Sequence, residues 1–136
     1  MVPDLLLGID VGTSSLKALL VDSRRSVVAE AGRSYALSMP RDGWSEQDPH
    51  DWWQAAVEAI REVLAAIAGG GSAPAAGRRV AAVGLTGQMH GLVLLDARLQ
   101  PVRPCILWND QRTAAECVEV ERRVGARRLI ELTGNP

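Results

Sequence analysis

The chain has 136 residues, which is enough to bury the core of one ordinary domain and too few for a two-domain enzyme. Its 15 basic and 16 acidic residues give a net charge of −1 and form no basic block, which argues against nucleic acid or an anionic membrane as a partner. A small neutral or anionic ligand is the better match. We expect no nucleic-acid partner and no membrane partner, and a homo-oligomer stays open.

The N-terminus and the cysteines predict a cytoplasmic protein. The apolar run at residues 5–9 lies between Asp4 and Asp10, so it is too short and too acidic for a signal peptide. Cys105 and Cys117 show neither a Cys-x-x-Cys spacing nor a cluster of His that would complete a metal site. This pattern is typical of free thiols in a reducing compartment.

The first three apolar runs predict an antiparallel meander. The runs at residues 5–9 and 16–21 are joined by a short polar turn, so we predict a hairpin. A third strand is expected over about residues 27–37, because Pro40 and Gly43 break the pattern after it. A loop follows.

A long helix is predicted next, with Asp48 as its N-cap and Pro49 at its first position. Apolar residues recur every third or fourth position to about Ala68, so one helix face should pack on the sheet. Residues 69–77 should form a flexible connection, and the fully apolar run at residues 80–85 predicts a central parallel strand. The expected apolar face of the helix consists of Trp53, Ala56, Val57, Ile60, Val63, Leu64 and Ile67.

The C-terminal third predicts shorter elements. Apolar runs at residues 92–95 and 105–108 indicate another hairpin or paired excursion. Asp110 is expected to cap a helix over about residues 111–124, and a shorter helix is expected over residues 127–132. The order of the elements is that of a mixed α/β fold and differs from the strict strand-helix alternation of a Rossmann unit.

The segment GIDVGTSSLK at residues 8–17, in the turn between the first two strands, carries the clearest chemistry. Gly12 permits a tight turn and a close approach to a ligand, while Thr13 and Ser14 offer hydroxyl and amide donors. Asp10 places a carboxylate at the mouth of the turn, which suits Mg²⁺ accompanied by phosphate oxygens. The alternative is an ordinary hairpin turn that Asp10 stabilises. The segment is neither a Walker A loop nor a dinucleotide fingerprint.

This Asp-x-Gly-Thr pattern resembles the first phosphate loop of the actin-like ATPase superfamily. The motifs GWSEQDP at residues 43–49, GQMHG at 87–91 and ILWND at 106–110 make the chain similar to the xylulokinases of the FGGY carbohydrate kinase family. The resemblance implies an α/β fold of the actin-like (ribonuclease H-like) type, with a mixed sheet, an antiparallel three-strand meander and an incomplete domain. We expect residues 1–136 to be the N-terminal portion of the first domain, without the second, nucleotide-binding domain.

Gln88, Met89 and His90 follow the predicted strand at residues 80–85, where α/β sheets present ligand-binding residues. His90 can donate to or accept from a hydroxyl, and Met89 can pack on a carbon skeleton. The resemblance implies that Met89 and His90 contact a sugar, and we place Gln88 in the same substrate site. The alternative is that His90 satisfies a loop carbonyl and Met89 fills core space.

Four further residues are weaker candidates because an ordinary structural role competes. Lys17 points from the second strand and would approach phosphate, although an exposed strand lysine is the commoner explanation. Asn109, Asp110 and Arg112 would line the cleft, yet Asp110 also has its capping role and Arg112 a helical one.

The resemblance implies transfer of a phosphoryl group from ATP to D-xylulose, giving D-xylulose 5-phosphate, with positioning and charge stabilisation doing most of the catalysis. Asp10 would be the catalytic residue that acts with Mg²⁺, and Gly12, Thr13, Ser14 and Lys17 would contact phosphate. The family's general base is an Asp downstream of this chain. The isolated chain is therefore expected to be inactive.

Three alternatives stay open. The first is another FGGY kinase, acting on ribulose, gluconate or glycerol, although the Gln-Met-His sequence at residues 88–90 argues against it. The second is a non-catalytic module that binds phosphate, sugar or a partner. The third is an inert fragment of an enzyme.

Overall fold

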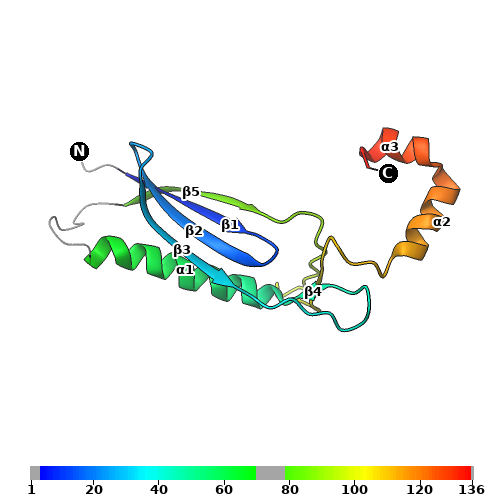
Figure 1. Cartoon of the computed structure of the whole chain (residues 1–136), viewed down its shortest axis with the longest axis horizontal. Coiled ribbons are helices and arrows are strands. Elements are labelled where there is room, and N and C mark those ends of the chain that lie inside the picture. Colours follow the sequence, from blue (N-terminus) through cyan, green and yellow to red (C-terminus); the bar gives the residue numbers. More distant parts are fainter. Residues whose placement is uncertain (1–3, 70–78, 136) are drawn as a thin grey trace.

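The computed structural model describes residues 4–69 and 79–135 and contains a main sheet with one long helix, a small second sheet and a two-helix arm (Figure 1). The strands of the main sheet are β1 (Leu5–Val11), β2 (Ser15–Asp22), β3 (Val27–Ser34) and β5 (Val80–Gly87). The other elements are β4 (Glu46–Gln47), α1 (Pro49–Gly69), β6 (Cys105–Ile106), α2 (Ala114–Val124) and α3 (Ala126–Thr133).

The main sheet has the strand order β3-β2-β1-β5. Short turns make β1, β2 and β3 antiparallel, whereas β5 runs parallel to β1 after the crossover through α1. The predicted meander, the mixed sheet and the parallel strand are therefore confirmed. β5 is not central, however, because it lies at the edge of the described sheet, and its Val83 and Leu85 are exposed.

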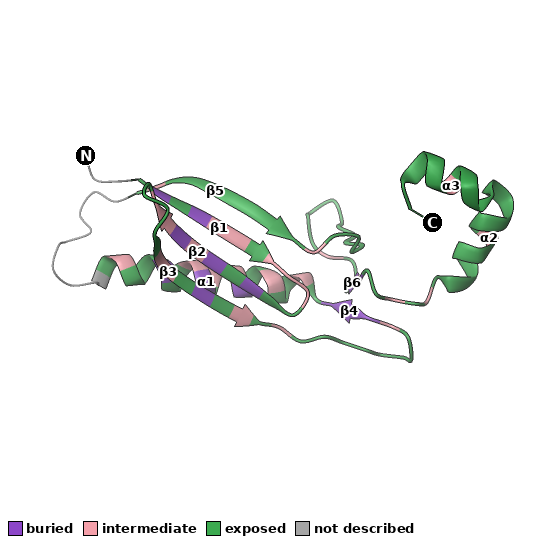
Figure 2. Ribbon diagram, turned by 45° about the horizontal axis from the view of Figure 1, so that its top comes forward, coloured by how far each residue is buried: buried purple, intermediate pink, exposed green. Residues whose placement is uncertain are grey.

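The core lies between α1 and the sheet, as the periodicity predicts. The Asp48 carboxylate accepts the backbone N–H of His50 at 2.9 Å, which caps the helix that Pro49 begins. Small side chains then let the helix lie close to the strands. The buried cluster joins the helix residues Ala55, Ala59 and Val63 to Leu5, Leu7, Leu16, Ala18, Leu20 and Ala31 of the sheet (Figure 2).

Trp53 lies outside the packed face of α1, contrary to the prediction. Ala55, Ala59 and Val63 follow one another at intervals of four residues and face the sheet. Trp53 precedes Ala55 by two residues, which is about 200° around an α-helix. Its side chain is consequently 72% exposed. Leu64 was also expected on the apolar face and is exposed as well.

β3 ends at Ser34, three residues before its predicted end. β2 begins at Ser15, which pairs with Ser34, so no strand remains for residues 35–37 to pair with. Tyr35 instead turns towards the loop between β1 and β2 and donates its N–H to the carbonyl of Ser14 at 3.4 Å. The connection predicted at residues 69–77 lies outside the described residues, except for Gly69, which ends α1.

β4 and β6 form the second sheet, a pairing that the sequence pattern did not indicate. Glu46 pairs with Ile106 and Gln47 pairs with Cys105. The paired excursion predicted for residues 92–95 and 105–108 is present as isolated antiparallel bridges, between Leu92 and Ile106 and between Leu95 and Pro101. The loop before α1 is thereby fixed to the segment after β5.

α2 and α3 form an arm that has no buried residues and extends away from the sheet (Figure 2). α3 agrees with the predicted helix within one residue at each end. α2 begins at Ala114, so the prediction that Asp110 caps it is wrong. The carboxylate of Asp110 is occupied elsewhere, by the N–H of Ser45 and by Arg112. Within residues 4–69 and 79–135, no helix has the length and apolar character needed to cross a membrane.

Candidate functional site

The loop at residues 12–14 is a tight turn with a carboxylate at its mouth. The N–H of Gly12 donates to the carbonyl of Ser15 at 3.0 Å, and a Cβ on Gly12 would lie 3.0 Å from that same oxygen. A larger residue would therefore have to displace the turn by a few tenths of an ångström. Asp10 is exposed near the end of β1, where its strand neighbours are Lys17 and Thr86.

All three carbonyls of this loop accept hydrogen bonds from the protein. The hydroxyl of Tyr35 donates to the Gly12 oxygen, Gln47 Nε2 donates to the Thr13 oxygen at 2.8 Å, and the N–H of Tyr35 donates to the Ser14 oxygen. Burial, with the charge of Asp10 as a second cause, raises the pKa of Tyr35, so its hydroxyl stays protonated and able to donate.

Two N–H groups of the loop, unlike its carbonyls, are not hydrogen-bonded to the described part of the protein. Within the described ranges, neither the N–H of Thr13 nor that of Ser14 has a hydrogen-bond partner. In a trans peptide, the carbonyl of one residue and the N–H of the next point in opposite directions. Holding the carbonyls of Gly12 and Thr13 towards the protein therefore turns the next two N–H groups outwards, and successive N–H groups of a turn are donors that an anion can accept from.

The segment Gln88-Met89-His90 lies directly against this loop. The N–H of Gln88 donates to the carbonyl of Val11 at 2.8 Å. A Cβ on Gly87 would lie 2.9 Å from that carbonyl oxygen, so the close approach of the two segments depends on glycine. The predicted phosphate and sugar residues are thus brought together at one end of the main sheet.

Met89 and His90 both face solvent. Met89 is 71% exposed and does not fill core space, unlike the alternative interpretation of this residue. His90 has a φ of 63°, a left-handed conformation that costs a non-glycine residue free energy. No described residue forms a hydrogen bond with its ring. Both side chains are available to a ligand beside the loop.

Lys17 is paired with a carboxylate across the sheet. Its ammonium Nζ lies 2.8 Å from Glu30 Oε1, and both side chains are exposed. The hydrogen bond to Glu30 raises the pKa of Lys17, so the charge persists at neutral pH. Lys17 is also the strand neighbour of Asp10, so its charge stays close to the loop.

Asp110 and Arg112 are the centre of an ionic network that joins two loops. Asp110 accepts the N–H of Ser45 at 2.7 Å, and Arg112 Nη2 lies 2.7 Å from both Asp110 Oδ2 and Glu46 Oε1. The Arg112 side chain, helped by the Ser45 N–H and opposed by burial, holds the pKa of Asp110 well below its usual range. Arg103 adds a second cation to Glu46.

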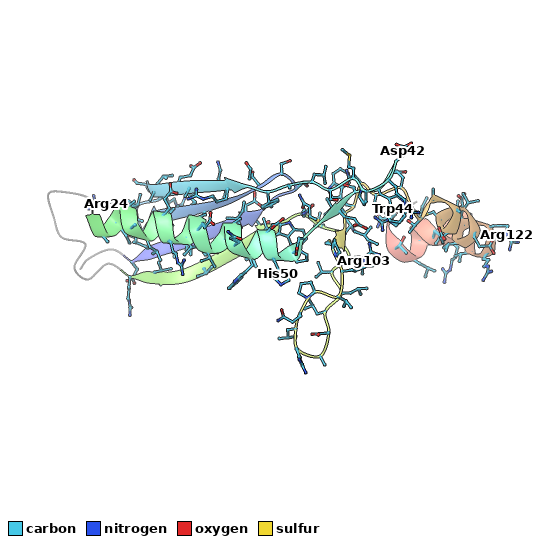
Figure 3. The ribbon with its side chains drawn as sticks, turned by 90° about the horizontal axis from the view of Figure 1, so that it is seen from below. Arg24, Asp42, Trp44, His50, Arg103 and Arg122 are labelled. Carbon is cyan, nitrogen blue, oxygen red and sulfur yellow. The ribbon has the colours of Figure 1, made fainter. Side chains whose placement is uncertain are left out.

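This network surrounds Trp44 at the base of the arm. The Arg112 guanidinium lies 3.7 Å from the centroid of the Trp44 ring, a cation–π contact. In Figure 3, Trp44 and Arg103 lie where the body of the molecule meets the arm. Asn109 is exposed next to the network. The contacts of Asp110 and Arg112 are accordingly those of a structural clamp.

Three side chains of the site were not named as site residues in the sequence analysis. Tyr35 and Gln47 hold the loop carbonyls, and the indole of Trp108 donates to Thr13 Oγ1 at 3.3 Å. Each comes from a segment distant from the loop along the chain. Only the motif strings that contain Gln47 and Trp108 hinted that these segments matter.

A groove of about 410 Å³ is lined by Asp10, Lys17 and their neighbours on β1, β2 and β5. Leu7, Leu16 and Ala18 face α1, and side chains alternate along a strand, so Asp10 and Lys17 lie on the opposite face of the sheet. Gly8 and Gly84 leave the floor of the groove without side chains. Within the described part of the chain, no three His, Cys, Asp or Glu side chains gather to hold a metal ion by themselves. Asp10 fits a Mg²⁺ that arrives with phosphate, because Mg²⁺ keeps waters and binds one or two carboxylates besides phosphate oxygens.

A mixed sheet, in which an antiparallel meander is followed after a helical crossover by a parallel strand, gives the chain the fold of the actin-like ATPase class. The sequence profile of the FGGY family of carbohydrate kinases, N-terminal domain, matches residues 5–136, and the chain belongs to this family.

Among its relatives, the xylulose kinase of Klebsiella pneumoniae is 44% identical over 129 residues, which are 95% of this chain and 25% of the relative. A crystal structure of a xylulose kinase from Rhodospirillum rubrum is 32% identical, with a TM-score of 0.82 over 93% of this chain and 25% of that one. A crystal structure of a xyloylose kinase from Brucella ovis is 42% identical, with a TM-score of 0.77 over 88% of this chain and 24% of that one. The chain thus spans about a quarter of the length of the relatives it matches.

Proposed function

We propose that the chain is the N-terminal part of the first domain of a kinase that transfers a phosphoryl group from ATP to D-xylulose, giving D-xylulose 5-phosphate. One observation carries the proposal: the loop with outward N–H groups and the Gln88-Met89-His90 segment are joined by the hydrogen bond from Gln88 N–H to the Val11 carbonyl. A phosphate and a polyol bound by these two segments would be neighbours. Such adjacency is what phosphoryl transfer requires.

In this proposal the chain's residues act by holding and orienting. The N–H groups of Thr13 and Ser14 bind phosphate oxygens, and Lys17 contributes positive charge nearby. Asp10 orients Mg²⁺ through one carboxylate, and the metal, when bound with ATP, neutralises charge on the phosphoryl oxygens.

The sugar side of the site uses Gln88, Met89 and His90. Met89 packs on the carbon skeleton, while the imidazole of His90 hydrogen-bonds a hydroxyl. No carboxylate of the described residues is assigned as the general base. An enzyme that uses ATP in this way belongs in the cytoplasm.

The closest competing proposal is a different acceptor. The glycerol kinase of Rhodospirillum centenum is 40% identical over 113 residues, 82% of this chain, and a gluconate kinase structure from Lactobacillus acidophilus has a TM-score of 0.82 at 26% identity. Release of ADP from the full-length protein, measured with D-xylulose, D-ribulose, gluconate and glycerol, decides between them. We expect the highest kcat/KM with D-xylulose, and a higher value with another acceptor would replace the substrate assignment.

The Asp10→Asn variant tests the role of the loop. Loss of the carboxylate should lower kcat about 100-fold or more while sugar KM changes little, because the interaction matters most as charge develops on the transferring group. Asp42→Asn, which alters an exposed carboxylate on the loop before β4, is the matched control and should keep wild-type kcat. Near-normal kcat of Asp10→Asn at saturating Mg²⁺ would reject the assignment.

A further inference from the structure

Gln47 is a buried amide at the meeting point of three segments. Its side chain belongs to the fully buried ones, with the residue 2% exposed, although it lies in a two-residue strand next to a loop. A buried amide is costly unless its polar atoms are hydrogen-bonded. Its backbone is held by the pairing of β4 with β6, which places Gln47 opposite Cys105. The amide therefore extends from a fixed base.

The indole of Trp52 determines which way the amide points. An indole N–H can only donate, and Trp52 Nε1 lies 3.1 Å from Gln47 Oε1. The oxygen of the amide must face Trp52, so the NH₂ group faces the carbonyl of Thr13 at 2.8 Å. The positions of the Gln47 side-chain oxygen and nitrogen are therefore fixed by a donor on one side and an acceptor on the other.

The same oxygen of Gln47 also accepts from the sugar-facing segment. Gln88 Nε2 donates to Gln47 Oε1 at 3.2 Å. This bond leaves Gln88 Oε1 buried and without a hydrogen-bond partner among the described residues. One amide thus contacts the phosphate loop through its nitrogen and the Gln88-Met89-His90 segment through its oxygen.

We propose that Gln47 is a positioning residue that ties the phosphate loop to the sugar-facing segment and sets their relative geometry. Its NH₂ group holds the Thr13 carbonyl inwards and so aims the Ser14 N–H at phosphate. Its oxygen fixes the amide of Gln88, and Trp52 keeps Gln47 itself in place. The consequence for phosphoryl transfer rests on the proposed kinase function, whereas the tie between the two segments does not.

Two variants of the full-length protein separate the two halves of the amide. Gln47→Met keeps the length of the side chain and removes every hydrogen bond, while Gln47→Glu keeps an acceptor for Trp52 and Gln88 and loses the donor to Thr13. Gln54→Met is the matched control, because Gln54 lies on the exposed face of α1 and donates only to Glu58 among the described residues.

We expect kcat to fall about tenfold in both Gln47 variants, because both lose the hydrogen bond to the Thr13 carbonyl, and one hydrogen bond is worth about that factor. The KM for sugar should rise several-fold only in Gln47→Met, since Gln47→Glu still holds Gln88. A merely structural defect would not split kcat from KM in this way. Unchanged kcat in both variants, or the same losses in Gln54→Met, would overturn the proposal.

Hydrogen exchange provides the readout that is independent of catalysis. Peptides covering residues 10–16 and 86–91 should both exchange faster in Gln47→Met than in the wild type, and in Gln47→Glu only the first should do so. If the wild type phosphorylates no sugar, the proposed function is wrong. The exchange pattern still shows whether Gln47 connects the loop to the Gln88-Met89-His90 segment. An active wild type with unchanged exchange in both variants would instead refute the tie alone.

Discussion

The two halves of the main sheet differ sharply in burial on the side where α1 packs. α1 covers β2 and β3, and Leu16, Ala18 and Leu20 are fully buried beneath it. Val83 and Leu85 of β5, which are in register with Leu7 and Ile9 of β1, are exposed. The same residue types in one sheet therefore contribute very differently to stability.

The candidate site lies at the end of the less covered half, which consists of β5 and of β1, whose Leu5 and Leu7 are buried but whose Ile9 and Val11 near the site are only partly buried. Asp10 belongs to β1, and Gln88, Met89 and His90 follow β5. Binding segments are commonly drawn from the parts of a protein with fewer buried contacts. The β2–β3 half therefore supplies a stable base, whereas the loop and the Gln88-Met89-His90 segment are held by individual hydrogen bonds.

The largest expected effect is a difference in stability when the same substitution, Leu→Ala, is made in each half of the sheet. Leu20 is 0% exposed and Leu85 is 73% exposed. Leu20→Ala should lower the free energy of unfolding of the 136-residue chain by about 2–5 kcal/mol, because it removes buried methyl groups and leaves a cavity. Leu85→Ala should change it by less than about 0.5 kcal/mol. Urea denaturation followed by tryptophan fluorescence measures both.

Leu20→Ala and Leu85→Ala should also be compared in the full-length protein. If further chain covers β5 there, the cost of Leu85→Ala should rise towards that of Leu20→Ala, since exposed apolar surface of this kind is a contact surface. The isolated chain should then self-associate in light scattering. Equal costs of the two substitutions in the isolated chain would contradict the difference between the halves.

The next effect concerns His90 at the end of the uncovered half. His90→Ala and His90→Gly should each lower kcat/KM for D-xylulose, by a factor that corresponds to about 1–3 kcal/mol of lost transition-state stabilisation, because a sugar hydroxyl loses its partner. Since φ is 63° at this position, His90→Gly should be about 1 kcal/mol more stable than His90→Ala. Steady-state kinetics and melting temperatures of both variants check this. Unchanged kcat/KM in both would show that the imidazole does not contact the sugar.

A smaller effect is expected at the hydrogen bonds that hold the loop. Tyr35→Phe keeps the ring and removes only the hydroxyl that donates to the Gly12 carbonyl. The free energy of unfolding should fall by about 1 kcal/mol, the usual net value of one hydrogen bond. Hydrogen exchange at residues 10–16 should also become faster. A variant as stable and as protected as the wild type would mean that the loop holds its shape unaided.

The smallest effect is a pH dependence at the base of the arm. The pKa of Asp110 is depressed in the folded protein, chiefly by the Arg112 side chain, so its stabilising contribution is complete above the unfolded pKa of about 4 and is lost as the pH falls towards the folded value. Asp110→Asn should therefore lower the melting temperature at pH 7 and at pH 5 alike. The difference from the wild type should shrink between pH 4 and pH 3. A constant difference over this range would exclude the ionic role.

The sequence by itself determined the elements whose causes are local. Apolar runs and polar turns specify the β1–β2–β3 meander, and Asp48 with Pro49 specifies the start of α1, because these preferences act between neighbours along the chain. The tight turn at Gly12 and the candidate loop residues also follow from local chemistry and the motifs.

Only the tertiary structure decided how the loop is held and what Asp110 does. Gln47 and Trp108 reach Thr13 across 34 and 95 residues of sequence, and Asp110 meets Ser45 across 65. No local sequence pattern specifies such pairs, because many polar side chains are long enough to make these hydrogen bonds and only the tertiary structure selects the one that does. Asp110 has the residue type of a helix cap, yet its carboxylate accepts from the distant Ser45 N–H and from Arg112, two residues along the chain. Folding brings Glu46 beside Arg112 and completes the network, because a buried charge is stable only with its counter-ion.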